Sequence, residues 1–209
     1  MTVDADINIQ FDCAPTRAGE TCELRVKLTH TVTGAPVTPD ELAITHTQKL
    51  HLFVNDQNLQ DYHHLHPQPT GEPGVYACSF TPATGNRYQG WAEFALARGS
   101  ETRQLQAALP SASRRSLRPS VRLASRAEAK DLHFSWNASE PLQAGKPCIA
   151  EVKVSDASGK PVSGFEPVMG AYAHLVGFSA DGQSMIHAHP EDCGKTSDSQ
   201  CLRFHLSPE

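Results

Sequence analysis

Hydrophobic and polar residues alternate in short runs along most of this chain, which is the pattern of half-buried β-strands. Such runs lie at residues 7–13, 22–32, 75–81, 87–97, 102–109, 132–139 and 148–162. Turn-forming residues separate the runs, and no stretch keeps the 3.6-residue period of an amphipathic helix. The pattern predicts an all-β protein of short strands, arranged as an immunoglobulin-like (Ig-like) β-sandwich.

The clearest predicted element is a hairpin over residues 174–190, HLVGFSADGQSMIHAHP. At its centre, Asp181-Gly182 favours a two-residue type I′ turn, because that turn needs positive φ at both central positions. This turn determines the register of the two strands and places Val176 opposite His187.

The same register gathers three histidines on one face of the hairpin. His174 faces His189 across the strands, and His187 lies two residues before His189, on the same side. Their Cβ atoms are then about 5–8 Å apart. Three neutral imidazoles at this spacing suit a transition metal such as copper, zinc or nickel.

An equivalent hairpin occurs earlier in the chain, at an offset of 123 residues. Four candidate ligand positions coincide at this offset: His46 with Met169, His51 with His174, His64 with His187, and His66 with His189. Both copies end in His-x-His-Pro, and the starts of the two units also align, with Cys22 over Cys148. The chain therefore consists of two copies of one unit.

We expect two Ig-like β-sandwich domains in tandem, at residues 1–110 and 131–209, joined by a basic linker at 111–130. The linker carries six Lys or Arg residues against Glu128 alone, a net charge of +5 in a chain whose formal total is −5. A solvated linker is the favoured interpretation, and contact with the acidic domains or with a phosphate-rich surface is the alternative.

The second copy lacks the last strands of the first. Its final run, CLRFHLSP, aligns with VYACSFTP, and residues 83–109 of the first copy have no counterpart. A sandwich without this hairpin leaves strand edges unprotected and loses much of its core. We expect a truncated chain or a second domain completed by a partner strand, and favour truncation as the simpler explanation.

Composition argues against several classes of function. No run approaches the 18 or so apolar residues of a membrane-spanning helix, so the chain is expected to be soluble. The start, MTVDADINIQF, is no signal peptide, so an exported form would be mature or truncated. No aromatic-studded basic face suggests nucleic-acid binding.

The six cysteines form no CxxC pair. Disulfides are compatible with this sequence, and the pairings to test are Cys13 with Cys22 and Cys193 with Cys201, since spacing does not establish the connectivity.

The histidine pattern has a structural alternative. Histidine is an ordinary half-exposed residue of β-strands, and the His-x-His-Pro segments could serve packing and inter-strand hydrogen bonds. A duplicated domain would repeat such structural segments as well. Metal binding is favoured by the shared face, by the partner histidine on the neighbouring strand and by the recurrence of both. The remaining histidines on predicted strands are interpreted as structural: His30, His63, His133 and His205.

His46 and Met169 are candidate fourth ligands. Each lies five residues before a strand histidine, on the opposite face unless the chain bends, and Gly170 can supply a bend only in the second copy. With them, the first site has four histidines and the second has three histidines and a thioether, which favours Cu(I). A buried core methionine is the structural alternative.

No catalytic machinery can be assembled from the spacing of residues. There is no Ser-His-Asp, Cys-His or HExxH arrangement, and Glu72 and Glu191 merely follow the His-Pro corners. Asp61 becomes Ser184 in the second copy, which argues against a carboxylate that both sites need. A catalytic metal site requires an open position and a placed base, and the sequence offers no such base.

At these residues the chain resembles a group of largely uncharacterised bacterial exported proteins with paired HLHP-type β-sandwich repeats. The resemblance is carried by KLHLFVNDQNLQDYHHLHPQPTGEPGVYACSFTP and EPVMGAYAHLVGFSADGQSMIHAHP and covers most of the chain. It implies an envelope or periplasmic setting and the handling of copper or another heavy metal. The missing export signal and the missing closing strands depart from the group's pattern.

Together these features predict a non-enzymatic copper-binding protein, periplasmic or secreted, with a three-histidine site in each domain. Zinc is the alternative metal. Such a protein would buffer metal or pass it to another envelope protein. The second hypothesis is a structural or interaction module that binds no metal, and the third is a metal-dependent hydrolase or oxidase.

Overall fold

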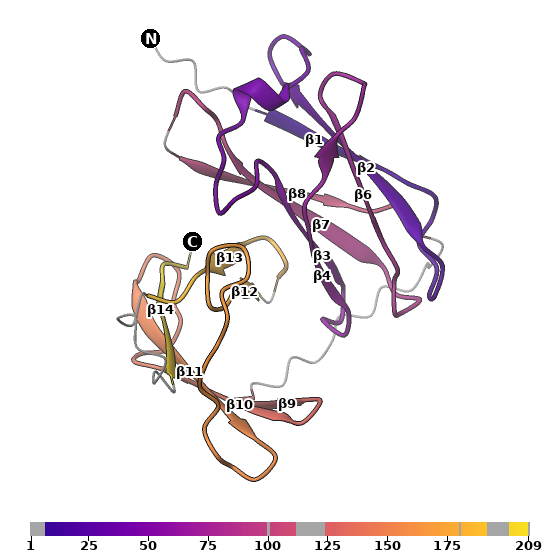
Figure 1. The fold of residues 1–209 in the computed structure, drawn as a ribbon. Coiled ribbons are helices and arrows are strands. Elements are labelled where there is room, and N and C mark those ends of the chain that lie inside the picture. The colour runs from indigo at the N-terminus through magenta and orange to yellow at the C-terminus, as the bar shows by residue number, and fades with distance from the viewer. Residues whose placement is uncertain (1–6, 100, 112–123, 180, 192–200, 209) are drawn as a thin grey trace. The chain divides into compact units, whose positions relative to one another are not determined.

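The computed structural model describes residues 7–99, 101–111, 124–179, 181–191 and 201–208. Within these ranges the regular structure consists of β-strands and one 3-10 helix, η1 (Pro39–Glu41) (Figure 1). Neighbouring strands in the sheets run antiparallel. The predicted all-β class is confirmed.

The chain divides into two compact units, Met1–Ser120 and Val121–Glu209. The first contains β1 (Ile7–Asp12), β2 (Cys22–His30), β3 (His51–Asp56), β4 (Tyr62–Leu65), β5 (Gln68–Pro69), β6 (Val75–Phe80), β7 (Tyr88–Ala95) and β8 (Thr102–Ala108). The second contains β9 (Arg126–Ala129), β10 (Leu132–Ala138), β11 (Cys148–Asp156), β12 (Leu175–Phe178), β13 (Met185–Ala188) and β14 (Cys201–Leu206).

The first unit has two four-stranded sheets, with orders β1-β2-β6-β5 and β4-β3-β7-β8. Strand alternation sends Leu24, Val26 and Leu28 of β2 into the interior, where each is fully buried. Leu52 and Val54 of β3 reach the same hydrophobic core from the other sheet. The sheets therefore pack as a sandwich around one core, and this strand order is one that an Ig-type sandwich can have. The Ig-like tandem stays a prediction.

The second unit has a sheet of order β9-β10-β11-β14 and a separate two-stranded sheet, β12-β13. The pairing Cys148–Leu206 between β11 and β14 stands where Cys22–Phe80 joins β2 and β6. Among the described residues of this unit, no strands correspond to β7 and β8, and Trp136 is only half-buried where Phe11 is buried. The core of the second unit is consequently smaller: Cys148, Ala150, Phe204 and Leu206.

The predicted linker differs from the structure at its C-terminal end. Residues 112–123 lie outside the described ranges, but Arg126–Ala129 forms β9 and pairs with β10. The run alternates charged residues with alanine, and its Glu128 lies 3.2 Å from His133 on β10. The segment was predicted to be linker because of its charges, but its alternation of charged residues with alanine is typical of a strand.

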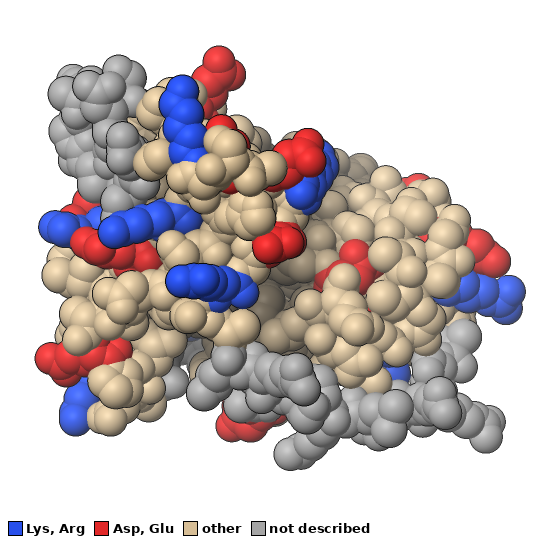
Figure 2. Space-filling model, turned by 90° about the horizontal axis from the view of Figure 1, so that it is seen from below, with Lys and Arg blue, Asp and Glu red and all other residues tan. Residues whose placement is uncertain are grey.

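Charge on the surface is mixed. On the face shown in Figure 2, Lys and Arg side chains are interspersed with Asp and Glu side chains among uncharged residues. The described part of the chain includes no helix with the length and apolar character needed to cross a membrane.

Candidate metal centre

Each unit contains one histidine hairpin, and the two hairpins have the same register. The pairs Leu52–Leu65, Phe53–His64, Val54–His63 and Asn55–Tyr62 recur as Leu175–Ala188, Val176–His187, Gly177–Ile186 and Phe178–Met185. Every pair is displaced by 123 residues on both strands. The predicted register of the second hairpin is thus confirmed where β12 and β13 pair.

The turn that closes the second hairpin differs from the predicted one. Gly182 N donates to Ser179 O at 2.9 Å, so the turn closes one residue earlier than a turn centred on Asp181-Gly182. The Ser179 hydroxyl accepts hydrogen bonds from Gln183 N and Ser184 N, and this side-chain competition for the backbone explains the change. The register survives because Ser179 N donates to Ser184 O at 3.0 Å.

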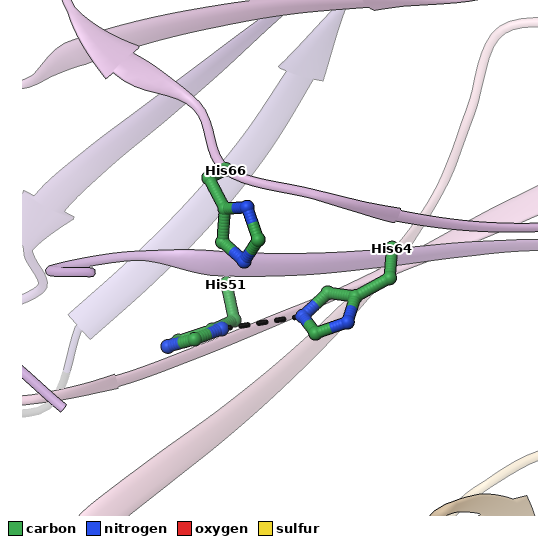
Figure 3. A group of neighbouring side chains, drawn as sticks. All are labelled: His51, His64 and His66. Atoms are coloured by element: carbon green, nitrogen blue, oxygen red, sulfur yellow. Dashed lines mark hydrogen bonds between the residues drawn. The ribbon is translucent and has the colours of Figure 1, made fainter. Parts of the chain in front are cut away.

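In the first unit the hairpin brings His51, His64 and His66 together. One nitrogen from each ring lies within 4.8 Å of the others. Nδ1 of His51 is 3.2 Å from Nε2 of His64, and the His66 ring centroid is 4.9 Å and 4.8 Å from those of His51 and His64. Figure 3 shows the three rings turned toward a common space, with His51 on β3, His64 on β4 and His66 in the segment that follows.

In the second unit His174, His187 and His189 form the equivalent group, again within 4.8 Å. Nδ1 of His174 is 3.4 Å from Nε2 of His187 and 2.9 Å from Nε2 of His189. The structure therefore brings together all six hairpin histidines that the sequence predicted as ligands, as two separate triads.

A backbone carbonyl orients the leading histidine of each triad. Nε2 of His51 lies 2.9 Å from Thr45 O, and Nε2 of His174 lies 2.9 Å from Val168 O. A carbonyl oxygen only accepts hydrogen bonds, so Nε2 carries the proton and Nδ1 presents its lone pair to the triad. Histidines that bind metal commonly donate their other ring N–H in this way.

The spacing of the nitrogens fits a shared metal ion. Two nitrogens that are each about 2.1 Å from one tetrahedral ion are about 3.4 Å apart. Hydrogen bonds between imidazoles explain the second triad less well, because Nδ1 of His174 has one lone pair but two close neighbours, His187 and His189. A cation at the centre would engage one lone pair from each ring.

His46 lies in a tight turn that the sequence interpretation did not anticipate in the first copy. Thr45 and Gln48 exchange backbone hydrogen bonds of 2.8 and 3.0 Å, and the central residues have positive φ, 47° at His46 and 73° at Thr47. The chain thus bends here without a glycine. The His46 ring centroid is 6.2 Å from that of His51, and the structure does not place His46 in the triad.

Met169 holds the same position in the second copy. Val168 and Ala171 exchange backbone hydrogen bonds of 2.8 and 3.2 Å, with φ of 52° at Met169 and 81° at Gly170. The turn presents the Val168 carbonyl to His174. Met169 is half-buried, and its role as a fourth ligand stays a prediction.

The other histidines lie beside carboxylates. His63 points away from the first triad, with Nε2 3.1 Å from Asp61 Oδ2 and its ring against Phe80. The remaining three pair with glutamates: His30 with Glu41, His133 with Glu128 and His205 with Glu191.

One carboxylate near the first triad, that of Glu93, was not among the site residues predicted from the sequence. Glu93 on β7 is the direct cross-strand partner of His51, so both side chains leave the same face of the sheet. Gln104 Nε2 donates to Glu93 Oε2 at 2.7 Å. Only the pairing of β3 with β7 brings Glu93 here, and no local spacing could reveal it.

The two triads on antiparallel hairpins define an all-β protein with a pair of candidate metal centres. A family model described as a domain of unknown function (DUF8832) matches residues 127–209, a range that includes the whole second triad. No curated protein matches the chain.

Proposed function

We propose that the protein binds one transition metal ion at each histidine triad, with copper as the metal, and that it buffers this metal or passes it on. The observation that carries the proposal is the repeated geometry of the triads. In both units Nδ1 of the leading ring and one nitrogen from each of the other two rings converge, while a backbone carbonyl anchors the opposite nitrogen of the leading ring.

The chemistry of the donors supports copper. Sites made of imidazole suit copper and zinc, and Cu²⁺ generally binds such sites more tightly than Zn²⁺ does. Met169 adjoins the second triad through its turn and would add a soft donor for Cu(I). Zinc is the alternative metal for both sites.

Three protein ligands leave a fourth coordination position open at the first triad, whereas Met169 would fill that position at the second triad when Cu(I) binds. A ligand from a donor or acceptor protein could enter there, so the arrangement is suited to exchange of metal. We place the protein in the bacterial envelope, periplasmic or secreted, with another envelope protein as exchange partner. The resemblance to exported HLHP-repeat proteins is the support for this setting.

The test is a titration of the metal-free protein with copper and with zinc. About two copper ions per chain are expected, with none bound tightly by a His64→Ala/His187→Ala double variant of unchanged circular dichroism. A His63→Ala/His133→Ala double variant is the control, since it also removes one histidine from each unit but outside the triads. Equally weak binding by all three proteins would contradict the proposal and favour a structural or interaction module.

A metal-dependent hydrolase at the first triad is a second candidate function, and Glu93 is the observation that favours it. A carboxylate opposite His51 could act as the base for a metal-bound water. Ester hydrolysis by the zinc-loaded protein that falls at least tenfold in Glu93→Gln, with zinc content unchanged, would support this candidate. No hydrolysis above free zinc would rule it out.

A further inference from the structure

Two cysteines of the first unit meet at one end of the β1–β2 pair. The register pairs Asp12 with Arg25, so Cys13 comes next along one strand and Cys22 opens the other. Side chains alternate along a strand, and Cys13 therefore follows Phe11 toward the interior. Cys22 is buried in the core of the first unit, and Cys13 packs against that core.

The side chains of Cys13 and Cys22 lie close enough for the Cys13 thiol to donate a hydrogen bond to Cys22. Cys22 Sγ lies 4.0 Å from the carbonyl oxygen of Ala14, the residue after Cys13. Burial, together with a hydrogen bond donated to Cys22, raises the pKa of the Cys13 thiol to about 12. Burial likewise raises the pKa of Cys22, so both cysteines are protonated thiols in the structure.

A third thiol, Cys78 on β6, lies on the other side of Cys22. Its strand partner is Leu24, and burial raises its pKa to about 12. These three thiols do not form a metal site, because in the described ranges only the histidine triads bring three ligand atoms within 4.8 Å of one another. The contact between Cys13 and Cys22 therefore points to chemistry between two thiols.

We propose that Cys13 and Cys22 form a disulfide when the protein meets a disulfide oxidant. Cys13, the more exposed of the two, first loses its proton to solvent, a step that its raised pKa makes slow. Its thiolate then attacks the oxidant, which forms a mixed disulfide and releases one thiol. Cys22 then attacks the Cys13 sulfur and releases the second thiol. Two protons leave the cysteines, and two electrons reduce the oxidant's S–S bond.

The disulfide closes a ring over residues 13–22 and joins the ends of β1 and β2. It constrains the unfolded chain and is expected to raise the thermal midpoint of the first unit by about 5–10 °C. The second unit is a natural control. Its Cys148 occupies the position of Cys22, whereas the position of Cys13 is taken by Ala138.

Peptide mapping tests the proposal directly. Full-length protein is incubated with oxidised glutathione and a chelator, quenched with acid, alkylated under denaturing conditions and digested with trypsin. Cleavage after Arg17 and Arg25 puts Cys13 and Cys22 on separate peptides, so only a disulfide can keep these peptides together. We expect this linked pair in the wild-type protein and in Cys148→Ser, and its loss in Cys22→Ser.

Two results would overturn the proposal: complete alkylation of both cysteines after oxidant treatment, or a link from Cys22 to Cys78. The wild-type map decides the question even if Cys22→Ser fails to fold. Because metal is excluded by the chelator, the outcome is independent of the function proposed for the triads.

Discussion

The two histidine triads are alike although their surroundings differ. In the first unit β3 pairs with β4 and with β7, whereas in the described part of the second unit β12 pairs with β13 alone. Even so, the leading histidine lies 3.2 Å from its neighbour in one triad and 3.4 Å in the other. The hydrogen bond to the turn carbonyl is 2.9 Å in both. The hairpin and the preceding turn are therefore sufficient to build the triad.

The two units differ in the side chains that surround and contact the histidine hairpin. The first hairpin has Asp61 in a hydrogen-bond network, Glu93 opposite its leading histidine and Phe53 against the His64 ring at 4.5 Å. The equivalents of Asp61 and Phe53 in the second hairpin are Ser184 and Val176. We infer that local sequence determines the geometry of the site and that the rest of the sandwich determines its stability.

The largest difference is expected from matched truncations in the two cores. Leu52 is fully buried between the sheets, whereas its equivalent Leu175 is half-buried. Leu52→Ala should cost the first unit about 3 kcal/mol, and Leu175→Ala should cost the second about 1 kcal/mol. Urea unfolding measures both, because each unit has one tryptophan and a Trp136→Phe or Trp91→Phe background isolates the other signal. Equal losses would show that the sandwich does not support the first hairpin.

The next effect concerns Asp61. Burial alone would raise its pKa, but hydrogen bonds from Tyr88 Oη at 2.6 Å, Ala83 N at 2.7 Å and His63 outweigh burial and hold the pKa below its ordinary value. Asp61→Asn should cost the first unit about 2 kcal/mol at pH 7.

The pH dependence follows from the lowered pKa. The native carboxylate stabilises the first unit fully above its unfolded value of 3.8, and this contribution is lost as the pH falls through the lower folded pKa. The gap between wild type and Asp61→Asn should therefore narrow below about pH 4. The second unit, which has Ser184 at this position, should unfold identically in both proteins. A gap that stays constant down to pH 2 would contradict the role of the charge.

The smallest expected effect is at the turn before each hairpin. Thr47 is β-branched and has a φ of 73°, whereas its equivalent is Gly170 at 81°. Thr47→Gly should relieve strain and stabilise the first unit by about 1 kcal/mol, and Gly170→Thr should destabilise the second by about 1–2 kcal/mol. Thermal unfolding of the same single-tryptophan backgrounds measures both shifts. A loss of stability in Thr47→Gly would mean that the threonine makes compensating contacts.

Much of this architecture could be predicted from periodicity. Alternation located the strands, and the repeat at 123 residues aligned the two hairpins and gathered both triads. The turn at Asp181-Gly182 was misplaced by one residue, because the Ser179 side chain competes for the backbone there. The predicted strand register was nevertheless correct, because it depends on the pairing of Ser179 with Ser184.

The features of the site that the sequence did not predict depend on backbone groups and on contacts between residues far apart in the chain. The Thr45 and Val168 carbonyls belong to the backbone, so the pattern of side chains cannot predict their role. The turn at His46-Thr47 has positive φ without a glycine, the residue from which such a turn is usually predicted. Glu93 reaches His51 only through the pairing of β3 with β7. Such pairings are long-range consequences of the fold, which a spacing argument within one hairpin does not contain.

The central claim, that each hairpin builds a metal site by itself, is tested most directly by copper titration of two single-site variants. His51→Ala should leave the second triad intact and His174→Ala the first. Each variant is expected to keep one tight copper ion per chain, with dissociation constants within about tenfold of each other, a difference of about 1.4 kcal/mol. Loss of both ions in either variant, or tight binding only when the first triad is intact, would contradict the claim.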